Sequence, residues 1–249
     1  MRRVVEIDLR AQGVAVDAGV NDAPLARLRG ERRSSLRLPV DWWLLGEGNR
    51  LTVRVSPLDD GEATPRLEVA IRDAEERHAP SVTFGWSLPE AGEFEPFEVA
   101  LPFVPTAVPA VRLWSLAEEV PTLEDRDVLA VRALARALID AVAARRIDDV
   151  VAILEFRVGE LAIAVDRSLD WMREATRENL SEILLAMDFS LREVDVEQLR
   201  LTPCGDGRVF HVTTVEGFEL ITGEADEGEL PPGMQVYVAR VEGAWRVVR

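Results

Sequence analysis

The stretch LRLPVDWWLLGEGNRLTVRV, residues 36–55, constrains the fold more than any other segment of the chain. Alternating apolar and polar residues lead to Pro39, and a short apolar step around Trp42 and Trp43 follows. A Gly-Glu-Gly-Asn turn then precedes residues 51–55, where apolar and polar residues alternate again. Alternation with a period of two is typical of a strand that buries one face. The stretch therefore predicts two strands joined by an apolar, near-helical step.

The first 108 residues repeat this pattern in short runs. Proline, glycine and aspartate separate the runs, and Gly13 stands between the first two. No helix of standard length fits this part of the chain. The spacing predicts an antiparallel β-sandwich, since each run has one apolar face and ends at a turn signal. The other alternating runs lie at residues 4–9, 14–16, 34–38, 66–72, 82–86 and 97–101.

The second half of the chain has a different periodicity. Residues 109–122 are rich in proline and predict an extended linker. Apolar residues then recur at spacings of three and four, which predicts helices over 122–146, 148–165 and 168–187. Whether 148–188 forms one helix or two stays open. After residue 188 the period of two returns, so residues 123–249 are expected to form an α+β domain, with three helices packed on a curved antiparallel sheet.

Two segments carry resemblances to known families. Residues 44–55, Leu-Leu-Gly-Glu-Gly-Asn followed by an alternating strand, resemble a turn of galactose-binding-like jelly-roll sandwich domains. Residues 236–248, with a Gly-x-Trp-x-Val strand after the turn at Glu242 and Gly243, resemble the closing hairpin of NTF2-like domains. The first resemblance implies a jelly-roll sandwich over residues 1–108. The second implies a cone-shaped NTF2-like domain over residues 123–249.

The charge of the chain limits its partners. The formal net charge is −16, with 14 arginines against 18 acidic residues before residue 116 and 15 against 27 after it. A field of this sign repels phosphate backbones, so nucleic acid and anionic membranes are not expected as partners. A basic protein is compatible with it. All 29 basic residues are arginine, which excludes Schiff-base and P-loop lysine chemistry and fits a GC-rich bacterial genome.

The same composition bears on compartment and catalysis. Cys204 is the single cysteine, so no disulfide forms within the chain. The N-terminus lacks the apolar core of a signal peptide, and the longest apolar runs, 150–154 and 161–165, are too short to span a bilayer. We therefore expect a cytoplasmic protein. Cys204 and the two histidines show no metal-ligand spacing, and no Gly-x-Ser-x-Gly elbow occurs, so no catalytic residue, metal or cofactor is predicted.

Three groups of residues are candidates for binding. His211 shares a strand face with Val209 and Thr213, which would line the pocket of an NTF2-like cone; the alternative is a histidine hydrogen-bonded at a sheet face. Trp42 and Trp43 are candidates for a sugar-stacking platform, with core packing as the alternative. An acidic run is the candidate for contact with a basic partner, with a solvated hairpin loop as the alternative. Its carboxylates are Glu224, Asp226, Glu227 and Glu229.

These observations favour a non-enzymatic bacterial binding protein that engages a protein partner through its acidic second domain, in an immunity or adaptor role. One alternative is an NTF2-like small-molecule-binding or weakly catalytic pocket with His211 at its wall. Another is a carbohydrate-binding sandwich module that uses Trp42 or Trp43. The sequence names neither the partner nor the ligand.

Overall fold

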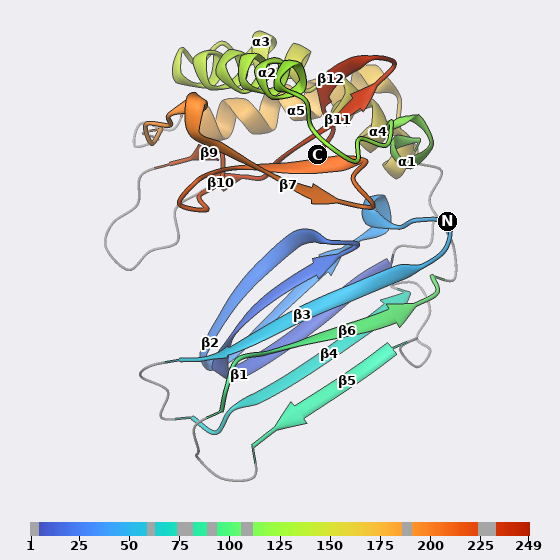
Figure 1. Cartoon of the computed structure of the whole chain (residues 1–249), viewed down its shortest axis with the longest axis vertical. Helices are drawn as coiled ribbons and strands as arrows, with labels where there is room; N and C mark the ends of the chain where they lie inside the picture. Colours follow the sequence, from blue (N-terminus) through green and yellow to red (C-terminus); the bar gives the residue numbers. More distant parts are fainter. Residues whose placement is uncertain are drawn as a thin grey trace. The chain divides into compact units, whose positions relative to one another are not determined.

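The computed structural model describes residues 5–58, 63–73, 82–88, 94–105, 112–185, 191–223 and 233–249. Contacts between residues divide the chain into two units, Met1–Pro109 and Ala110–Arg249, which we call unit 1 and unit 2. Antiparallel strands dominate the described residues, and the α-helices among them lie in unit 2 (Figure 1). The prediction of a β-rich α+β chain is confirmed at this level.

A long hairpin is the centre of unit 1. Strands β1 (Val5–Val20) and β2 (Ala23–Pro39) pair along their whole length, and Asn21 and Asp22 between them have φ angles of 52° and 66°. Two successive positive φ angles are the geometry of a tight hairpin turn, which Asn and Asp tolerate. Asn21 and Asp22 therefore form the turn of this hairpin.

Gly13 corrects the prediction of two separate strands at residues 4–9 and 14–16. The chain continues through Gly13 as one strand, because its φ of 63° accommodates a bulge where the pairing with β2 shifts register. A Cβ atom at this position would lie 2.5 Å from the carbonyl oxygen of Ala63. The glycine that reads as a break in the sequence therefore bends a continuous strand.

The remaining strands of unit 1 complete one antiparallel sheet among the described residues, and this sheet curls (Figure 1). Strand β4 pairs with the part of β1 before the bulge, and β3 pairs with the part after it. Strand β5 extends the sheet beyond β4, and β6 extends it beyond β3. The bounds are β3 (Asn49–Pro57), β4 (Arg66–Asp73), β5 (Val82–Ser87) and β6 (Phe97–Phe103).

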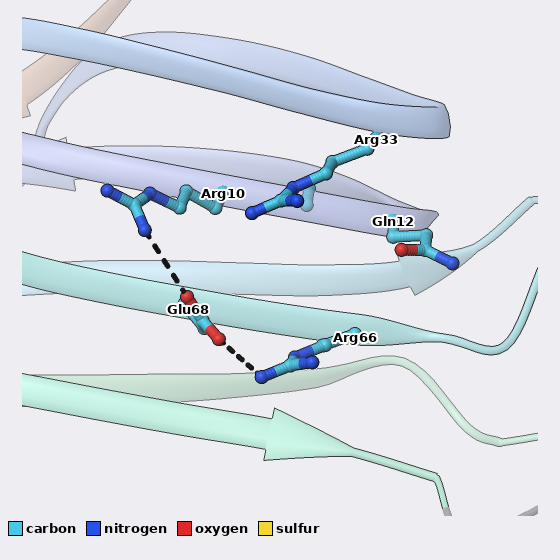
Figure 2. Close-up of a pocket in the computed structure, with 6 residues that line it drawn as sticks. Arg10, Gln12, Arg33, Arg66 and Glu68 are labelled. Carbon is cyan, nitrogen blue, oxygen red and sulfur yellow. Dashed lines mark hydrogen bonds and ion pairs between the residues drawn. The ribbon is translucent and has the colours of Figure 1, made fainter.

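The two faces of this sheet differ in polarity. Ile7 and Leu9 of β1 are almost fully buried, while the alternate positions carry Asp8, Arg10 and Gln12. Arg10 approaches the carboxylate of the buried Asp8 to 3.2 Å, as an ion pair within one strand. Figure 2 shows charged side chains of β1, β2 and β4 gathered on this polar face. Strand alternation therefore gives unit 1 one core face and one charged face.

The segment between β2 and β3 is held by buried polar groups. A 3₁₀ helix, η1 (Asp41–Trp43), forms the near-helical step that the sequence predicts. The carboxylate of Asp41 accepts a hydrogen bond from Val5 N at 3.0 Å. Asn49 Oδ1 accepts one from Leu45 N at 2.8 Å, and Asn49 Nδ2 donates to Leu45 O at 3.0 Å. These side-chain hydrogen bonds satisfy backbone groups that are not paired with a neighbouring strand of the sheet.

Unit 2 begins with helices. The sequence left open whether residues 148–188 form one helix or two, and the structure has separate helices in this stretch. Asp166 has a left-handed backbone with φ 54° and ends one helix. Ser168 caps the next, with its hydroxyl oxygen accepting from Trp171 N at 3.2 Å. A helix ends at a left-handed residue without any proline or glycine. The helices are α1 (Leu113–Leu116), α2 (Asp125–Ala143), α3 (Ile147–Ile153), α4 (Glu155–Val165) and α5 (Leu169–Leu184).

The helices of unit 2 share a core with an antiparallel sheet. In the described part of the chain this sheet has the order β12-β11-β8-β7, and a short pair, β9 and β10, accompanies it. Leu138 of α2, Val158 of α4, and Phe210 and Val212 of β8 belong to one buried cluster. The strands are β7 (Leu199–Cys204), β8 (Val209–Thr214), β9 (Ile221–Thr222), β10 (Gly233–Met234), β11 (Val236–Val241) and β12 (Ala244–Val247), and a 3₁₀ turn, η2 (Val196–Gln198), precedes β7.

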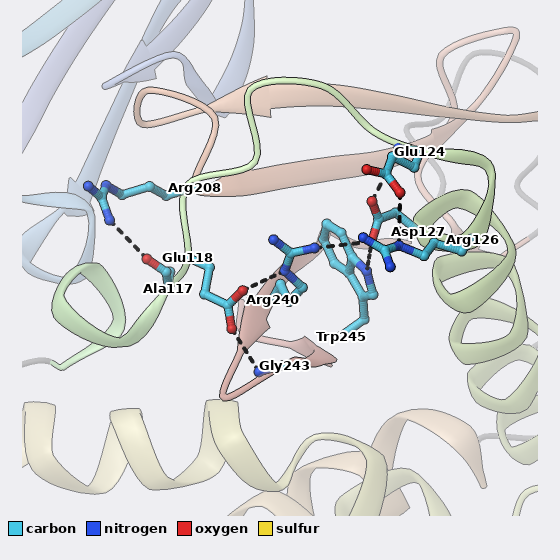
Figure 3. Close-up of polar contacts among 9 residues, drawn as sticks. All are labelled: Ala117, Glu118, Glu124, Arg126, Asp127, Arg208, Arg240, Gly243 and Trp245. Atoms are coloured by element: carbon cyan, nitrogen blue, oxygen red, sulfur yellow. Dashed lines mark hydrogen bonds and ion pairs between the residues drawn. The ribbon is translucent and has the colours of Figure 1, made fainter.

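A polar network joins the start of α2 to the closing hairpin (Figure 3). Arg240 Nε donates to Glu118 Oε2 at 2.6 Å, and Trp245 Nε1 donates to Asp127 Oδ1 at 3.1 Å. Asp127 also forms a capping box with Glu124 at the start of α2. The segment before α2, which the sequence predicts to be a linker, is thus fixed to unit 2.

Among the described residues, no helix has both the length and the apolar character that crossing a bilayer requires.

Candidate functional site

His211 lies within strand β8 and is 5% exposed. Its Nε2 lies 2.9 Å from Glu219 Oε2, and its ring stacks on Tyr237 of β11 with centroids 4.5 Å apart. Burial raises the pKa of Tyr237, with smaller contributions from Cys204 and Glu219. The phenol is therefore neutral at physiological pH, and the three side chains form a stacked, hydrogen-bonded cluster.

This histidine cluster faces away from the helices. Phe210 and Val212, the neighbours of His211 in β8, belong to the core that the helices and the sheet share. Successive side chains of a strand point to opposite faces, so His211 lies on the other side of the sheet. A ligand pocket between the helices and the sheet would therefore not have His211 at its wall.

The two neighbouring tryptophans, Trp42 and Trp43, differ in how far they are exposed to solvent. Trp43 is 3% exposed, and its carbonyl oxygen accepts a hydrogen bond of 2.6 Å from Asn21 Nδ2. Trp42 is partly exposed. A flat surface for sugar stacking needs exposed rings, and only Trp42 of the pair offers exposed area. The pair does not form a joint platform.

The acidic run Glu224, Asp226, Glu227 and Glu229 lies outside the described residues. Cys204 is 1% exposed, and its Sγ lies 3.5 Å from the carbonyl oxygen of Thr202. Among the described residues, no three His, Cys, Asp or Glu side chains lie together so as to hold a metal ion.

Helix α5 carries an exposed face that the sequence analysis missed. Glu174, Glu178 and Glu182 are exposed and follow one another at intervals of four residues. Trp171, 53% exposed, and Leu185, 55% exposed, lie three residues before and after this row. Spacings of three and four place all five side chains on one side of the helix. We call them the α5 acidic face; the signal for it was the Glu-x₃-Glu-x₃-Glu spacing in the sequence.

Arginines beside this face are already engaged. Arg177 pairs with Asp148 at 2.9 Å and with Glu174 at 2.6 Å, and these contacts raise its pKa. Glu178 and Glu182, by contrast, make no ion pair within the described part of the chain. The α5 acidic face therefore keeps two carboxylates whose charge is not compensated by a neighbouring cation.

The inner side of α5 explains why the glutamates point outward. Met172 and Leu184 are buried and pack in the core of unit 2, and Leu180 packs against it. Burying this apolar stripe fixes the rotation of the helix, so the acidic residues on the opposite side are presented to solvent.

No family model, curated protein or solved structure was found to match the chain.

Proposed function

We propose that this protein acts by binding another protein, without catalysis, through the acidic surface of unit 2. The α5 acidic face carries the proposal: three glutamates stand in a row between the exposed side chains of Trp171 and Leu185. Exposed aromatic residues supply much of the affinity at protein interfaces, and a surrounding charge supplies specificity and a faster encounter. This combination on one rigid helix supports a binding role.

The partner that fits this face is a basic segment with its own apolar residues. Glu178 and Glu182 have no ion-pair partner within the described chain, so they are available to arginine or lysine side chains. The length of the row, from residue 171 to 185, corresponds to about 21 Å of helix at 1.5 Å per residue. A helix or extended segment with cations at matching intervals would cover it. An immunity or adaptor role would use such a contact.

Affinity capture at low and high salt tests the proposal. The wild-type chain is compared with a triple variant, Glu174→Gln, Glu178→Gln and Glu182→Gln. A second triple variant, Asp140→Asn, Glu193→Gln and Glu242→Gln, removes the same charge from exposed acids elsewhere on unit 2. We expect one captured protein to be lost in the first variant and at high salt, and kept in the second.

A purified partner then allows the affinity to be measured. We expect the first triple variant to weaken binding by about tenfold or more, because three charges facing a basic segment are removed. Trp171→Ala should weaken binding at high salt as well, since its contribution is apolar. Equal losses in the two triple variants would show a general charge effect and would contradict a site on α5.

We also propose a fold type for each of the two units. We infer a sandwich of jelly-roll type for unit 1, which is supported by the bulge at Gly13 that separates the pairing of β4 from that of β3. An NTF2-like arrangement for unit 2 is supported by helices that share a core with one face of the antiparallel sheet. An experimental structure of the whole chain would test both assignments by the strand order and the layers.

The two alternative functions remain predictions, and the structure limits which residues each of them could use. A small-molecule or weakly catalytic pocket would have to use His211 from the sheet face that lies opposite the helices. A carbohydrate site in unit 1 would have to rely on Trp42 without the ring of Trp43. Glycan binding that is lost in Trp42→Ala would support the carbohydrate function over the protein-binding function.

A further inference from the structure

Unit 1 has a groove of about 150 Å³ on the charged face of its sheet (Figure 2). Its polar lining consists of five side chains from three neighbouring strands, and Ala11 contributes to the lining as well. In the register of the sheet, Gln12 stands opposite Arg33 on one side and Arg66 on the other, and Arg10 stands opposite Glu68. We call the set Arg10, Gln12, Arg33, Arg66 and Glu68 the arginine groove.

The arginine groove contains more positive than negative charge. Glu68 is shared between Arg66, at 2.6 Å, and Arg10, at 3.8 Å. Arg10 also reaches Asp8 at 3.2 Å. Arg33 makes no ion pair within the described part of the chain, although its side chain borders the groove. Three guanidinium groups therefore meet one carboxylate, on a chain whose overall formal charge is −16.

Among the described residues, the carboxylates next to the groove are shared with arginines that lie partly outside it. Asp8 is buried and lies within 4 Å of three arginines at once: Arg10, Arg37 at 3.5 Å and Arg72 at 3.8 Å. Glu6 approaches Arg37 at 3.7 Å. Within the described part of the chain, Asp8 and Glu6 thus contact arginines other than Arg33, so Arg33 can bind a ligand from outside.

We propose that the arginine groove binds the phosphate group of a small molecule. A guanidinium presents a planar fork of donors that matches two oxygens of a phosphate, and several forks can share its oxygens. A phosphomonoester carries a charge of about −1.5 to −2 at neutral pH, which balances the excess of the groove. The amide of Gln12 adds a neutral donor beside Arg33 and Arg66.

The size and openness of the groove limit what enters it. Its volume lies well below the roughly 300–1,000 Å³ of sites that enclose drug-sized ligands, so the phosphate end of the ligand enters and the remainder stays outside. Each carboxylate group of a dicarboxylate has only two oxygens and one charge, so at one position in the groove it satisfies one fork. Glu68 competes with the ligand for Arg10 and Arg66, so this carboxylate sets the affinity.

Calorimetric titration of the full chain at low salt tests the proposal with three probes: inorganic phosphate, glycerol phosphate and succinate. We expect both phosphate compounds to bind with a dissociation constant on the order of 1 mM or below, and succinate to bind more weakly. Equal affinity for inorganic phosphate and glycerol phosphate assigns the groove to the free ion. Tighter binding of glycerol phosphate assigns it to an ester. Succinate binding as tightly as either would overturn the proposal.

Three single variants locate the binding. Arg33→Gln should weaken phosphate binding about tenfold or more, because it removes the unpaired fork. Arg29→Gln removes the same charge from an exposed position of the same strand outside the groove, and it should change binding by less than about twofold. Glu68→Gln should tighten binding about threefold or more, since the competing carboxylate is gone. Equal weakening by Arg33→Gln and Arg29→Gln, or no gain with Glu68→Gln, would refute a site in the groove.

Discussion

Asn21 Nδ2 donates a hydrogen bond of 3.0 Å to Asn49 Oδ1, and both side chains are buried. Asn21 lies in the hairpin turn between β1 and β2, and Asn49 is the first residue of β3. Asn21 Oδ1 also accepts from Arg50 N at 2.9 Å. The pair therefore ties the hairpin turn to the segment that carries Trp43, and it connects parts of the chain 28 residues apart.

Asn49→Ala should lower the free energy of unfolding of unit 1 by about 3 kcal/mol, because buried donors and acceptors at Asn21 and Leu45 lose their partner. The control is Asn179→Ala on the exposed side of α5, which should stay within about 0.5 kcal/mol of wild type. Urea unfolding of the full chain measures both. A loss no larger than that of the control would show that the amide network does not hold this segment.

Gly205 meets the side chain of Trp114. A Cβ atom built on Gly205, which has a φ of 55°, would lie 2.4 Å from the Trp114 ring. We expect Gly205→Ala to destabilise unit 2 by about 2–4 kcal/mol, from the left-handed backbone and the overlap together. Gly243→Ala is the matched control, since its φ is 76° and nothing lies within 4 Å of the added atom. Similar losses in urea unfolding of the two variants would argue against the overlap.

The period-two runs of unit 1 were sufficient to predict most of its strands, because each strand buries one face. They did not predict that β1 continues through Gly13. A glycine with a positive φ either ends a strand or carries a bulge, and only the pairing of β1 with β2, β3 and β4 decides between the two. That pairing joins residues far apart in the chain, so local periodicity does not contain it.

The candidate sites were harder to predict than the strands. The row of Glu174, Glu178 and Glu182 was visible as a spacing, but its exposure depends on which side of α5 meets the core. The arginine groove has no local signal, because Arg10, Arg33 and Arg66 come together only through strand pairing. His211 was placed correctly in a strand, and the sheet face to which it points required the position of the helices.

Glu160 is fully buried in α4, and it supports the start of α1. Its Oε2 accepts hydrogen bonds from Arg112 N at 2.7 Å and from Leu113 N at 2.8 Å. Glu160→Leu should destabilise unit 2 by about 3 kcal/mol, since two backbone donors lose their acceptor, and Glu160→Gln should cost less because a carbonyl oxygen remains. Hydrogen exchange of residues 112–117 should accelerate in the leucine variant. Equal exchange rates in the two variants would contradict this role.

Asp127 makes the stability of unit 2 depend on pH. Burial opposes its ionisation, but the hydrogen bonds from Glu124 N and Trp245 Nε1 and the charge of Arg240 outweigh burial and lower its pKa. The unfolded chain therefore binds more protons than the folded one near pH 4 and below. The stability from Asp127 is complete above the ordinary aspartate pKa of about 4, and it is lost as the pH falls through the lowered value of the folded state.

Asp127→Asn should lower the free energy of unfolding by about 1–2 kcal/mol at pH 7, because the capping box and the charged hydrogen bonds are weakened. The difference from wild type should shrink as the pH falls below about 4, since Asp127 of the unfolded wild-type chain then binds a proton that the folded chain binds only at lower pH. Urea unfolding at each pH measures this difference in the free energy of unfolding. Hydrogen exchange then shows whether the loss lies in α2. Asp140→Asn on the exposed side of α2 serves as the control for general acid effects. A difference that stays constant down to pH 3 would show that the charge of Asp127 does not stabilise the fold.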